Sequence, residues 1–220
     1  MKKAKNVFII ILLFYFYAMS TSLLAGFFLP NTGSVNIATL ISRCLFSIPF
    51  LYVLFKKTGI TVYQDPITHY VSLKEWLSFS IVGFVLGSMA KMIGCLLRTP
   101  SASLSNSQDT LSLDFIAYIF AVLIVAPVIE ELFFRKWMIS YLERKKFKTV
   151  FIILISSIVF FLGHISWTNN IFRLDSFIFG VVMCCIYIKY RDIRLCIFVH
   201  FINNLTVNII GIIIHHYTLL

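Results

Sequence analysis

Long apolar runs separated by short polar stretches make up most of the chain. A helix needs about 20 apolar residues to cross the hydrocarbon core of a bilayer. Runs of about that length predict seven helices, over roughly 7–28, 36–55, 76–97, 115–142, 149–166, 172–189 and 194–214. The fourth is strongly apolar only as far as Ile129 and then continues as a mixed, amphipathic helix. We therefore predict an all-α fold, a polytopic bundle of about seven transmembrane helices, with six to eight as the range.

The composition excludes the soluble classes. Of the 220 residues, 60% are hydrophobic and only 13% are charged, whereas a soluble domain carries about twice that charged fraction. A soluble core cannot absorb so much apolar surface and still leave a wettable exterior. A soluble globular domain, a disordered chain and a nucleic-acid module are all excluded. We expect residues 1–220 to form a single membrane domain.

The formal net charge of +10 orients this domain instead of indicating a nucleic-acid partner. With a cytoplasmic N-terminus and seven alternating spans, fifteen basic residues fall inside and two, Arg98 and Arg173, fall outside. The fifteen are Lys2, Lys3, Lys5, Lys56, Lys57, Lys74, Arg135, Lys136, Arg144, Lys145, Lys146, Lys148, Lys189, Arg191 and Arg194. This asymmetry follows the positive-inside rule and predicts a multi-pass protein of the cell membrane.

The N-terminal segment and the five cysteines have structural interpretations. The start, Met1-Lys-Lys-Ala-Lys5, resembles that of a signal peptide, but its apolar run is longer and further spans follow, which favours an uncleaved anchor. Five cysteines, at 44, 95, 184, 185 and 196, show no disulfide or metal-ligand spacing. We expect them to be small buried hydrophobes.

Ionisable groups inside a span are costly and therefore mark candidate functional sites. The fourth span carries Glu130 and Glu131. Glu131 and Arg135 are four residues apart and share a helix face, so they can neutralise each other. Glu130 has no partner at helical spacing, and an unpaired carboxylate in apolar surroundings suits a general base. Pro127 should free the Leu123 carbonyl and kink the helix.

Two later spans carry polar groups of the same kind. The fifth ends in Phe160-Phe-Leu-Gly-His164, where Gly163 would let another helix approach closely. The seventh carries His200 and Asn204, which are four residues apart and project together. A single such group is usually an interhelical hydrogen-bonding residue. Groups on three spans, however, can surround one water and one carbonyl.

Other polar groups in the spans have structural interpretations. Arg43 and Lys91 are isolated, and both can extend toward the membrane surface, although Arg43 could also pair with a carboxylate. Asn203 and Asn208 extend a polar stripe on the last helix and are expected to make interhelical contacts. Ser156 and Ser157 lack the elbow motif of a serine hydrolase.

The depths of these groups do not agree at first sight. At 1.5 Å per residue from the basic residues that flank each span, Glu130 and His164 lie about 21 and 24 Å from the cytoplasmic edge, but His200 lies only about 9 Å from it. Either the helices tilt, or the segment 136–148 lies along the membrane interface.

At these residues the chain resembles a known family, the CPBP intramembrane proteases, which include type II CAAX prenyl endopeptidases and bacteriocin-processing enzymes. EELFFR, from Glu130 to Arg135, matches the family's EExxxR motif. FFLGH, ending at His164, matches FxxxH, and HFINN, from His200 to Asn204, matches HxxxN. The resemblance makes 115–208 the catalytic core and leaves 1–98 as variable N-terminal helices.

The resemblance implies hydrolysis of a peptide bond inside the membrane. It assigns activation of the water to Glu130 and His164, and stabilisation of the oxyanion to His200 and Asn204. Glu131 and Arg135 become supporting residues. The cofactor stays open, because Glu130, His164 and His200 could supply the His₂Glu ligands of a catalytic Zn²⁺, whereas a metal-free mechanism that depends on the glutamate is equally compatible.

The substrate and biological role are less defined. A peptide or membrane-protein substrate is expected, in a bilayer that composition suggests is a bacterial cytoplasmic membrane. Self-immunity to a bacteriocin, or peptide maturation, are the roles considered, with a bacteriocin or its receptor as a further candidate partner. The alternatives are a non-catalytic immunity protein that acts by binding and, third, a transporter, for which no internal repeat is found.

Overall fold

A computed structural model describes residues 2–61, 71–96, 112–164 and 174–218. Within these ranges the chain is helical throughout, apart from short turns. The first three helices are α1 (Lys2–Thr32), α2 (Val35–Thr58) and α3 (Leu73–Leu96). A continuous helix over 113–144 follows, and then come α7 (Thr149–Gly163), α8 (Leu174–Tyr190) and α9 (Ile193–Thr218). The all-α prediction and the expected seven helices are thus confirmed for the described residues.

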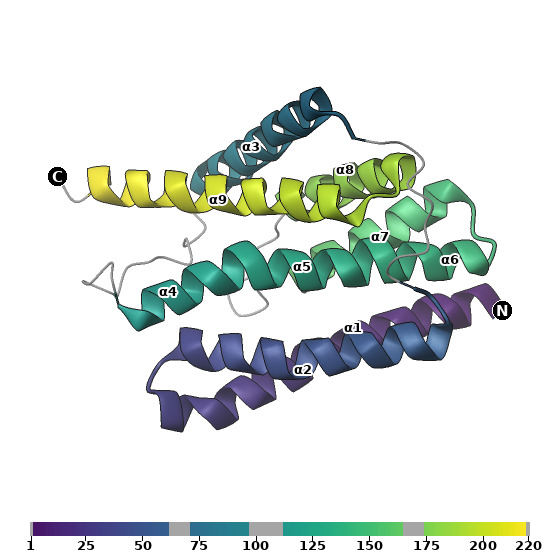
Figure 1. Cartoon of the computed structure of the whole chain (residues 1–220), viewed down its shortest axis with the longest axis horizontal. Coiled ribbons are helices and arrows are strands. Elements are labelled where there is room, and N and C mark those ends of the chain that lie inside the picture. The colour runs from purple at the N-terminus through teal and green to yellow at the C-terminus, as the bar shows by residue number, and fades with distance from the viewer. Residues whose placement is uncertain (1, 62–70, 97–111, 165–173, 219–220) are drawn as a thin grey trace.

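The 113–144 helix, here called the central helix, lies in the middle of the bundle. It is divided into α4 (Leu113–Phe120), η1 (Ala121–Val125), α5 (Ala126–Glu131), η2 (Leu132–Ile139) and α6 (Ser140–Arg144), of which η1 and η2 are π-helical. The α1–α2 pair packs on one side of the central helix and α9 on the other, with α3 outside α9 (Figure 1). The central helix therefore contacts both halves of the bundle.

Five of the helices are long and apolar enough to cross a membrane. These are Phe8–Thr32, Val35–Thr58, Leu73–Ile93, Leu113–Arg144 and Ile193–Ile214. The other two predicted spans, 149–166 and 172–189, correspond to α7 and α8, which have 15 and 17 residues. Residues 165–173, where those predictions ended and began, lie outside the described residues.

The basic helix ends gather at one end of the bundle. The start of α1, the end of α2, the α6–α7 turn and the α8–α9 turn all lie there, opposite the C-terminus (Figure 1). Arg144 donates to the carbonyls of Thr58 and Gly59 at 2.8 and 3.0 Å, which ties the central helix to the end of α2. Arg191 forms a bidentate pair with Glu143 at 2.8 and 2.5 Å, which ties the two turns together. This arrangement agrees with the alternation expected from the positive-inside rule.

At the opposite end, α2 is fastened to the start of the central helix. Ser34 caps α2, because its hydroxyl accepts from the Ile37 N–H at 3.1 Å. The same hydroxyl donates to Asp114, and the Asn36 side-chain amide donates to the other Asp114 oxygen at 2.6 Å. The Asp114 carboxylate thus joins two helix N-termini, where negative charge is favourable.

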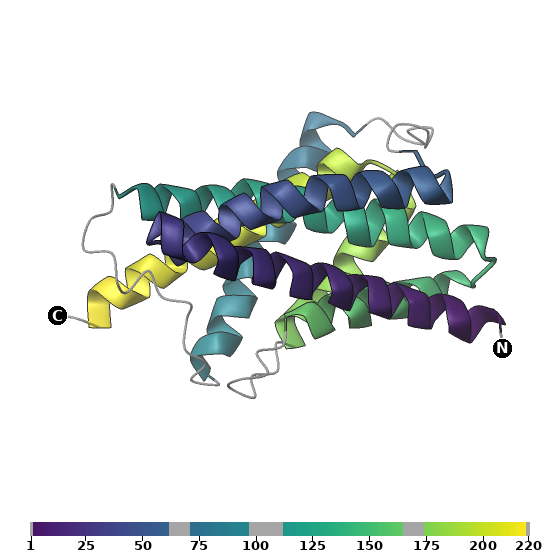
Figure 2. The same ribbon diagram turned by 90° about the horizontal axis from the view of Figure 1, so that it is seen from below.

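Two glycines set the crossing of α3 and α9. A Cβ on Gly83 would lie 2.8 Å from the Val199 carbonyl oxygen, and one on Gly87 would lie 2.7 Å from that of Asn203. Gly83 and Gly87 form a GxxxG pattern, which lets membrane helices approach at backbone distance. α3 crosses the bundle at a steep angle (Figure 2). The crossing lies directly behind the part of α9 that carries His200 and Asn204.

We predict that Gly87→Ala destabilises the protein by about 1–3 kcal/mol, the usual cost of overpacking. The new methyl would meet backbone on α9, which cannot rotate away as a side chain can. Thermal unfolding of the detergent-solubilised protein measures the change. Gly26→Ala is the matched control, because a Cβ there meets nothing within 4 Å. Equal stability of the two variants would contradict a close α3–α9 crossing.

Candidate active site

The three polar motifs meet at the Glu130 carboxylate. Glu130 lies on α5, His164 follows the last residue of α7, and His200 lies on α9. The Glu130 Oε2 atom is 3.8 Å from His164 Nε2 and 3.9 Å from His200 Nε2. Both distances are too long for a direct hydrogen bond. Both are short enough for the oxygen of one water molecule to contact the carboxylate and an imidazole together. The expected grouping of an acid and two imidazoles is therefore present.

Glu131 and Arg135 form a second, fully buried layer beside this carboxylate. Both side chains have 0% exposure, and Glu131 Oε2 lies 3.2 Å from Arg135 Nε. The other oxygen, Oε1, accepts from His200 Nδ1 at 2.8 Å. The pairing of Glu131 with Arg135 agrees with the prediction from helical spacing. The hydrogen bond from His200 to Glu131 was not predicted, because it joins residues 69 positions apart.

The hydrogen bonds determine the tautomer of each imidazole. The Phe160 carbonyl can only accept, so His164 Nδ1, 2.8 Å away, carries a proton. The Glu131 carboxylate likewise accepts from His200 Nδ1. In each neutral ring the lone pair is therefore on Nε2, the nitrogen that faces Glu130. Fixing one ring nitrogen in order to direct the other is how proteins prepare catalytic and metal-binding histidines.

Asn204 lies one turn along α9 from His200 and contacts the central helix at Val122. In η1 the Ala126 N–H donates to Ala121, five residues back. In this register the next donor, at residue 127, would serve the Val122 carbonyl, but residue 127 is proline and has no N–H. Asn204 Nδ2 donates to that Val122 carbonyl at 3.0 Å instead. We predicted that Pro127 would free the Leu123 carbonyl, as it would in a regular α-helix; in the π-helical register the carbonyl without a backbone donor from residue 127 is that of Val122.

Neighbouring amides orient Asn204. Its Oδ1 accepts from Asn203 Nδ2 at 3.1 Å, so the Nδ2 side of the Asn204 amide faces the central helix. One turn further on, Asn208 donates to the Asn204 carbonyl and accepts from the Tyr118 hydroxyl, both at 2.8 Å. The contact with Tyr118 on α4 agrees with the interhelical role expected for Asn208. Only one of the two Asn204 N–H groups is used by Val122.

Aromatic rings enclose the histidines and the buried arginine. Phe160 stacks on the His164 ring with centroids 4.3 Å apart, and its ring also lies 4.9 Å from the Arg135 guanidinium. Phe179 meets the His200 ring edge to face at 4.8 Å. Behind His164, a Cβ on Gly163 would lie 2.5 Å from the Phe14 ring, so the predicted close approach of another helix, α1, is confirmed. These contacts restrict the orientations of both rings.

The exposures divide the polar groups of the site into two sets. His164 and Glu130 side chains are 32% and 23% exposed, whereas His200 is 4% exposed and Glu131 and Arg135 are not exposed at all. Glu130 Oε2 itself is buried and makes no hydrogen bond within the described part of the chain. The site thus opens on the side of His164 and Glu130. Ser156 and Ser157 are buried in the α7–α8 region and bond Phe134 and Cys184, away from the site.

The donor types suit a divalent metal, although the present spacing is not that of a metal cluster. Two Nε2 lone pairs and one carboxylate oxygen face one another, and the His200–Glu131 bond has the form of an outer-shell contact. Among the residues that the structure describes, no group of three or more His, Cys, Asp and Glu side chains lies at metal-binding distances. The four cysteines described are free; Cys184 and Cys196 are buried as expected, whereas Cys44 is half-buried and Cys185 is exposed, so the expectation of burial is wrong for Cys185.

Comparison with known proteins agrees with the site. Residues 112–206 match the family model described as type II CAAX prenyl endopeptidase Rce1-like. This match confirms the resemblance found from the three motifs, and it covers the central helix, α7, α8 and most of α9. No curated protein and no solved structure gives a significant match.

We predict that Glu131→Gln costs about 3–5 kcal/mol of stability, because it leaves the buried Arg135 charge without its partner. Glu143→Gln, which removes the carboxylate of the partly exposed Arg191 pair, should cost about 1 kcal/mol or less. Thermal unfolding in detergent measures both. Combining Glu131→Gln with Arg135→Met should recover part of the loss. Similar losses in the two single variants would refute the special role of the buried pair.

Proposed function

Because residues 112–206 match the Rce1-like type II CAAX prenyl endopeptidases, we propose that this chain is an intramembrane endopeptidase. It hydrolyses a peptide bond in a peptide or a membrane-associated protein. One observation supports this most directly. Two imidazoles with fixed Nδ1 protons direct their Nε2 atoms to within 3.9 Å of the same carboxylate oxygen. Such an arrangement is suited to holding and activating a water molecule.

In the proposed mechanism Glu130 is the general base. A water bound between Glu130 Oε2 and His164 Nε2 gives a proton to the carboxylate as its oxygen attacks the substrate carbonyl. The C–N bond of the tetrahedral intermediate then breaks, and the leaving nitrogen takes the proton back from Glu130. Atoms and charge balance, since one water and one peptide bond become a carboxyl and an amine.

Asn204 and His200 stabilise the oxyanion in this scheme. One N–H of Asn204 Nδ2 is held on Val122, and the second N–H is the one proposed to donate to the oxyanion. His200 can donate from Nε2 only when both ring nitrogens carry protons, because Nδ1 already donates to Glu131. Glu130, Glu131 and Arg135 together carry a net charge of −1, so one imidazolium makes the site neutral. A donor of this kind typically contributes about 100- to 1000-fold in rate.

Glu131 and Arg135 act as positioning residues. Arg135 holds one Glu131 oxygen, and the other oxygen holds His200. Neither side chain is exposed, and neither touches the opening of the site. Their proposed role is to fix the His200 ring and to balance its charge.

A divalent metal, one of the two alternatives that the sequence leaves open, would be held by His164 Nε2, His200 Nε2 and the Glu130 carboxylate. When bound, such an ion polarises the substrate carbonyl and acidifies the attacking water. Elemental analysis of the purified protein tests this. A stoichiometric metal that is lost in His164→Ala, together with inactivation by a chelator, supports a metalloprotease. Activity that survives chelation of a metal-free preparation supports the glutamate-dependent mechanism.

The membrane and the biological context of the protein are part of the proposal. The basic ends of the helices support a cell-membrane protein with a cytoplasmic N-terminus, and we propose the bacterial cytoplasmic membrane. Self-immunity to a bacteriocin, or maturation of a peptide, is the proposed context, with a bacteriocin or its receptor as a partner. A non-catalytic immunity protein would need to bind the bacteriocin or its receptor but would not need Glu130 as a base.

We predict that Glu130→Gln abolishes hydrolysis while leaving the thermal unfolding temperature within a few degrees of wild type. The amide keeps the shape of the carboxylate but cannot accept the proton. Release of fragments from a prenylated CAAX peptide and from a pool of membrane peptides, followed by mass spectrometry, measures the activity.

Glu143→Gln is the control, since it also replaces one carboxylate on the central helix and lies in its last turn. It should retain cleavage. If the Glu130→Gln protein cleaves peptides or confers bacteriocin immunity as well as wild type does, the chain is not a glutamate-dependent protease. Immunity without cleavage would favour the non-catalytic role that acts by binding.

A further inference from the structure

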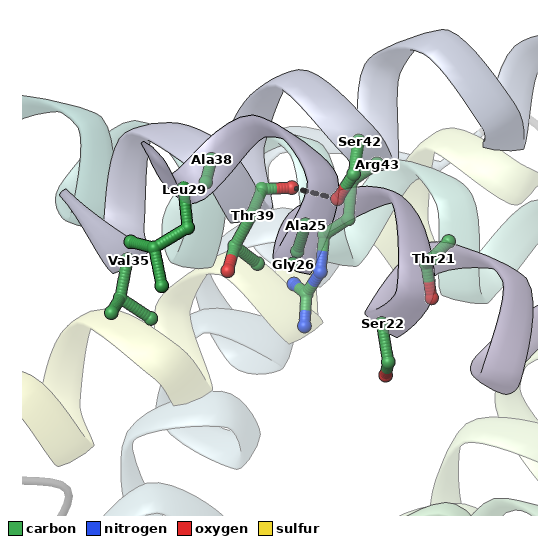
Figure 3. A pocket seen from close by; sticks show the side chains of 10 residues that line it. All are labelled: Thr21, Ser22, Ala25, Gly26, Leu29, Val35, Ala38, Thr39, Ser42 and Arg43. Atoms are coloured by element: carbon green, nitrogen blue, oxygen red, sulfur yellow. Dashed lines mark hydrogen bonds between the residues drawn. The ribbon is translucent and has the colours of Figure 1, made fainter. Parts of the chain in front are cut away.

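A polar cavity of about 320 Å³ lies between α1 and α2, apart from the catalytic residues. It is lined by Thr21, Ser22 and Gly26 on α1 and by Ser42 and Arg43 on α2, among others. Figure 3 shows the Arg43 side chain extending from α2 toward Gly26 on α1. The size of the cavity is within the range of small-ligand pockets. No motif of the candidate active site includes any of these residues.

Arg43 brings a charge that the described chain does not neutralise. Its side chain makes no hydrogen bond or ion pair with any residue that the structure describes, apart from its electrostatic effect on Tyr17. An unpaired guanidinium within a membrane span is unfavourable, and such groups usually face a polar cavity and pair with an opposite charge. The occupant of the cavity should therefore supply one negative charge.

The position of Arg43 along α2 indicates where this negative charge comes from. α2 has 24 residues and is about 36 Å long, a little more than the hydrocarbon core of about 30 Å. Arg43 lies about 12 Å along α2 from its start at Val35, at the end opposite the basic helix ends. An arginine at this depth can extend its guanidinium toward the nearer membrane surface. The anions at that level are the phosphodiesters of the lipid headgroups, in the outer leaflet of the proposed orientation.

The surroundings of the cavity suit a lipid better than a small soluble anion. The cavity is open, because Ser22, Leu29 and Val35, which all line it, are exposed. Toward the basic end of the pair, next to the cavity, the rings of Phe16 and Phe46 meet across the two helices with centroids 6.0 Å apart, and Phe16 is exposed. A polar hollow beside an apolar surface fits the headgroup and the acyl chains of one lipid. A free phosphate ion would use only the hollow.

The hydroxyl groups of the cavity specify the type of headgroup. Thr21 donates to the Ala18 carbonyl at 2.9 Å and Ser22 to the same carbonyl at 3.0 Å, while Ser42 donates to Thr39 at 2.9 Å, as Figure 3 also shows. Since each hydroxyl proton is used within its own helix, the oxygens present lone pairs to the cavity. The cavity thus offers one cationic fork and several acceptors. It suits a phosphodiester whose headgroup carries hydrogen-bond donors.

From these observations we propose that the α1–α2 cavity binds one anionic phospholipid of the phosphatidylglycerol class. The Arg43 guanidinium pairs with the phosphodiester, the Thr21 and Ser22 oxygens accept from the glycerol hydroxyls, and the acyl chains lie along Phe16 and Phe46. Phosphatidylcholine has no headgroup donor, and phosphatidylethanolamine has donors but no net charge, so neither both fits the acceptors and neutralises Arg43. This inference is independent of the proposed function, because it involves neither Glu130 nor a substrate.

Binding is tested on the full chain in phosphatidylcholine nanodiscs that also contain phosphatidylglycerol or phosphatidylmethanol, which has the same charge but no headgroup hydroxyl. Native mass spectrometry of the released protein counts the lipids that stay bound. One phosphatidylglycerol should be retained about 10- to 100-fold over phosphatidylcholine, as expected for a charged hydrogen-bonded pair, and about 2- to 10-fold over phosphatidylmethanol. Arg43→Gln should bring the first ratio to about one. Thr21→Val should lower only the second ratio.

Lys57→Gln is the matched control, because it removes one exposed positive charge from the same helix, α2, outside the cavity. It should keep both ratios. Gly26→Leu is a second test variant that leaves every charge in place. A Cβ on Gly26 meets nothing within 4 Å, so the leucine fills the cavity without displacing the chain, and it should also abolish retention. Added phosphatidylglycerol should raise the thermal unfolding temperature of wild type and Lys57→Gln in detergent, but not that of Arg43→Gln or Gly26→Leu.

Three results would overturn the proposal. The first is equal retention of phosphatidylglycerol and phosphatidylcholine by wild type. The second is retention that Arg43→Gln and Gly26→Leu leave unchanged, or that Lys57→Gln lowers as much as Arg43→Gln does, since the lipid would then bind elsewhere on the basic surface. The third is displacement of the lipid by millimolar glycerol phosphate, which would assign the cavity to a soluble phosphate compound.

Discussion

The geometry of the site depends on the two contacts of the Glu131 carboxylate. It is fully buried and bridges Arg135, one turn along its own helix, to His200 on α9. A buried carboxylate is tolerable only if charges and hydrogen bonds satisfy it, so Glu131 requires both partners. This requirement fixes the angle of the His200 ring and the distance between the central helix and α9. Glu130 precedes Glu131 by one residue and points about 100° away from it around the helix axis. It is therefore left facing the two imidazoles without such a partner.

Proline and asparagine provide a second link between the same two helices. Pro127 withdraws the donor for the Val122 carbonyl in the π-helical register, and Asn204 replaces it. An amide that caps a backbone carbonyl is held more firmly than one restrained by packing alone, because leaving the carbonyl unpaired inside a membrane is costly. The irregular helix is therefore what holds the Asn204 amide, one turn beyond His200 on α9. Behind α9, the glycines of α3 keep this helix in place at backbone distance.

The sequence allowed the groups of the site to be predicted, but not all of their contacts. Helical spacing predicted the Glu131–Arg135 pair and left Glu130 unpaired, because both inferences concern residues one turn apart. The His200–Glu131 bond and the Asn204–Val122 bond join distant segments, and no local pattern specifies them. Two explanations were considered for the different depths of Glu130 and His200: tilted helices, or a segment 136–148 along the membrane interface. Tilt fits better, since residues 132–144 continue the central helix and 133–139 are buried. The GxxxG pattern at Gly83 was readable from the sequence, although its partner helix was not.

Each half of the molecule is left with one uncompensated charge. Glu130, Glu131 and Arg135 leave an excess of one negative charge near the histidines, and Arg43 leaves one positive charge in the α1–α2 cavity. Neither excess is stable in a low-dielectric interior unless a proton or a ligand compensates it. In the proposed mechanism, an imidazolium at His200 would compensate the first excess. The charge balance of the site and the stabilisation of the oxyanion would then depend on the same imidazolium, which the Glu131 carboxylate holds in place.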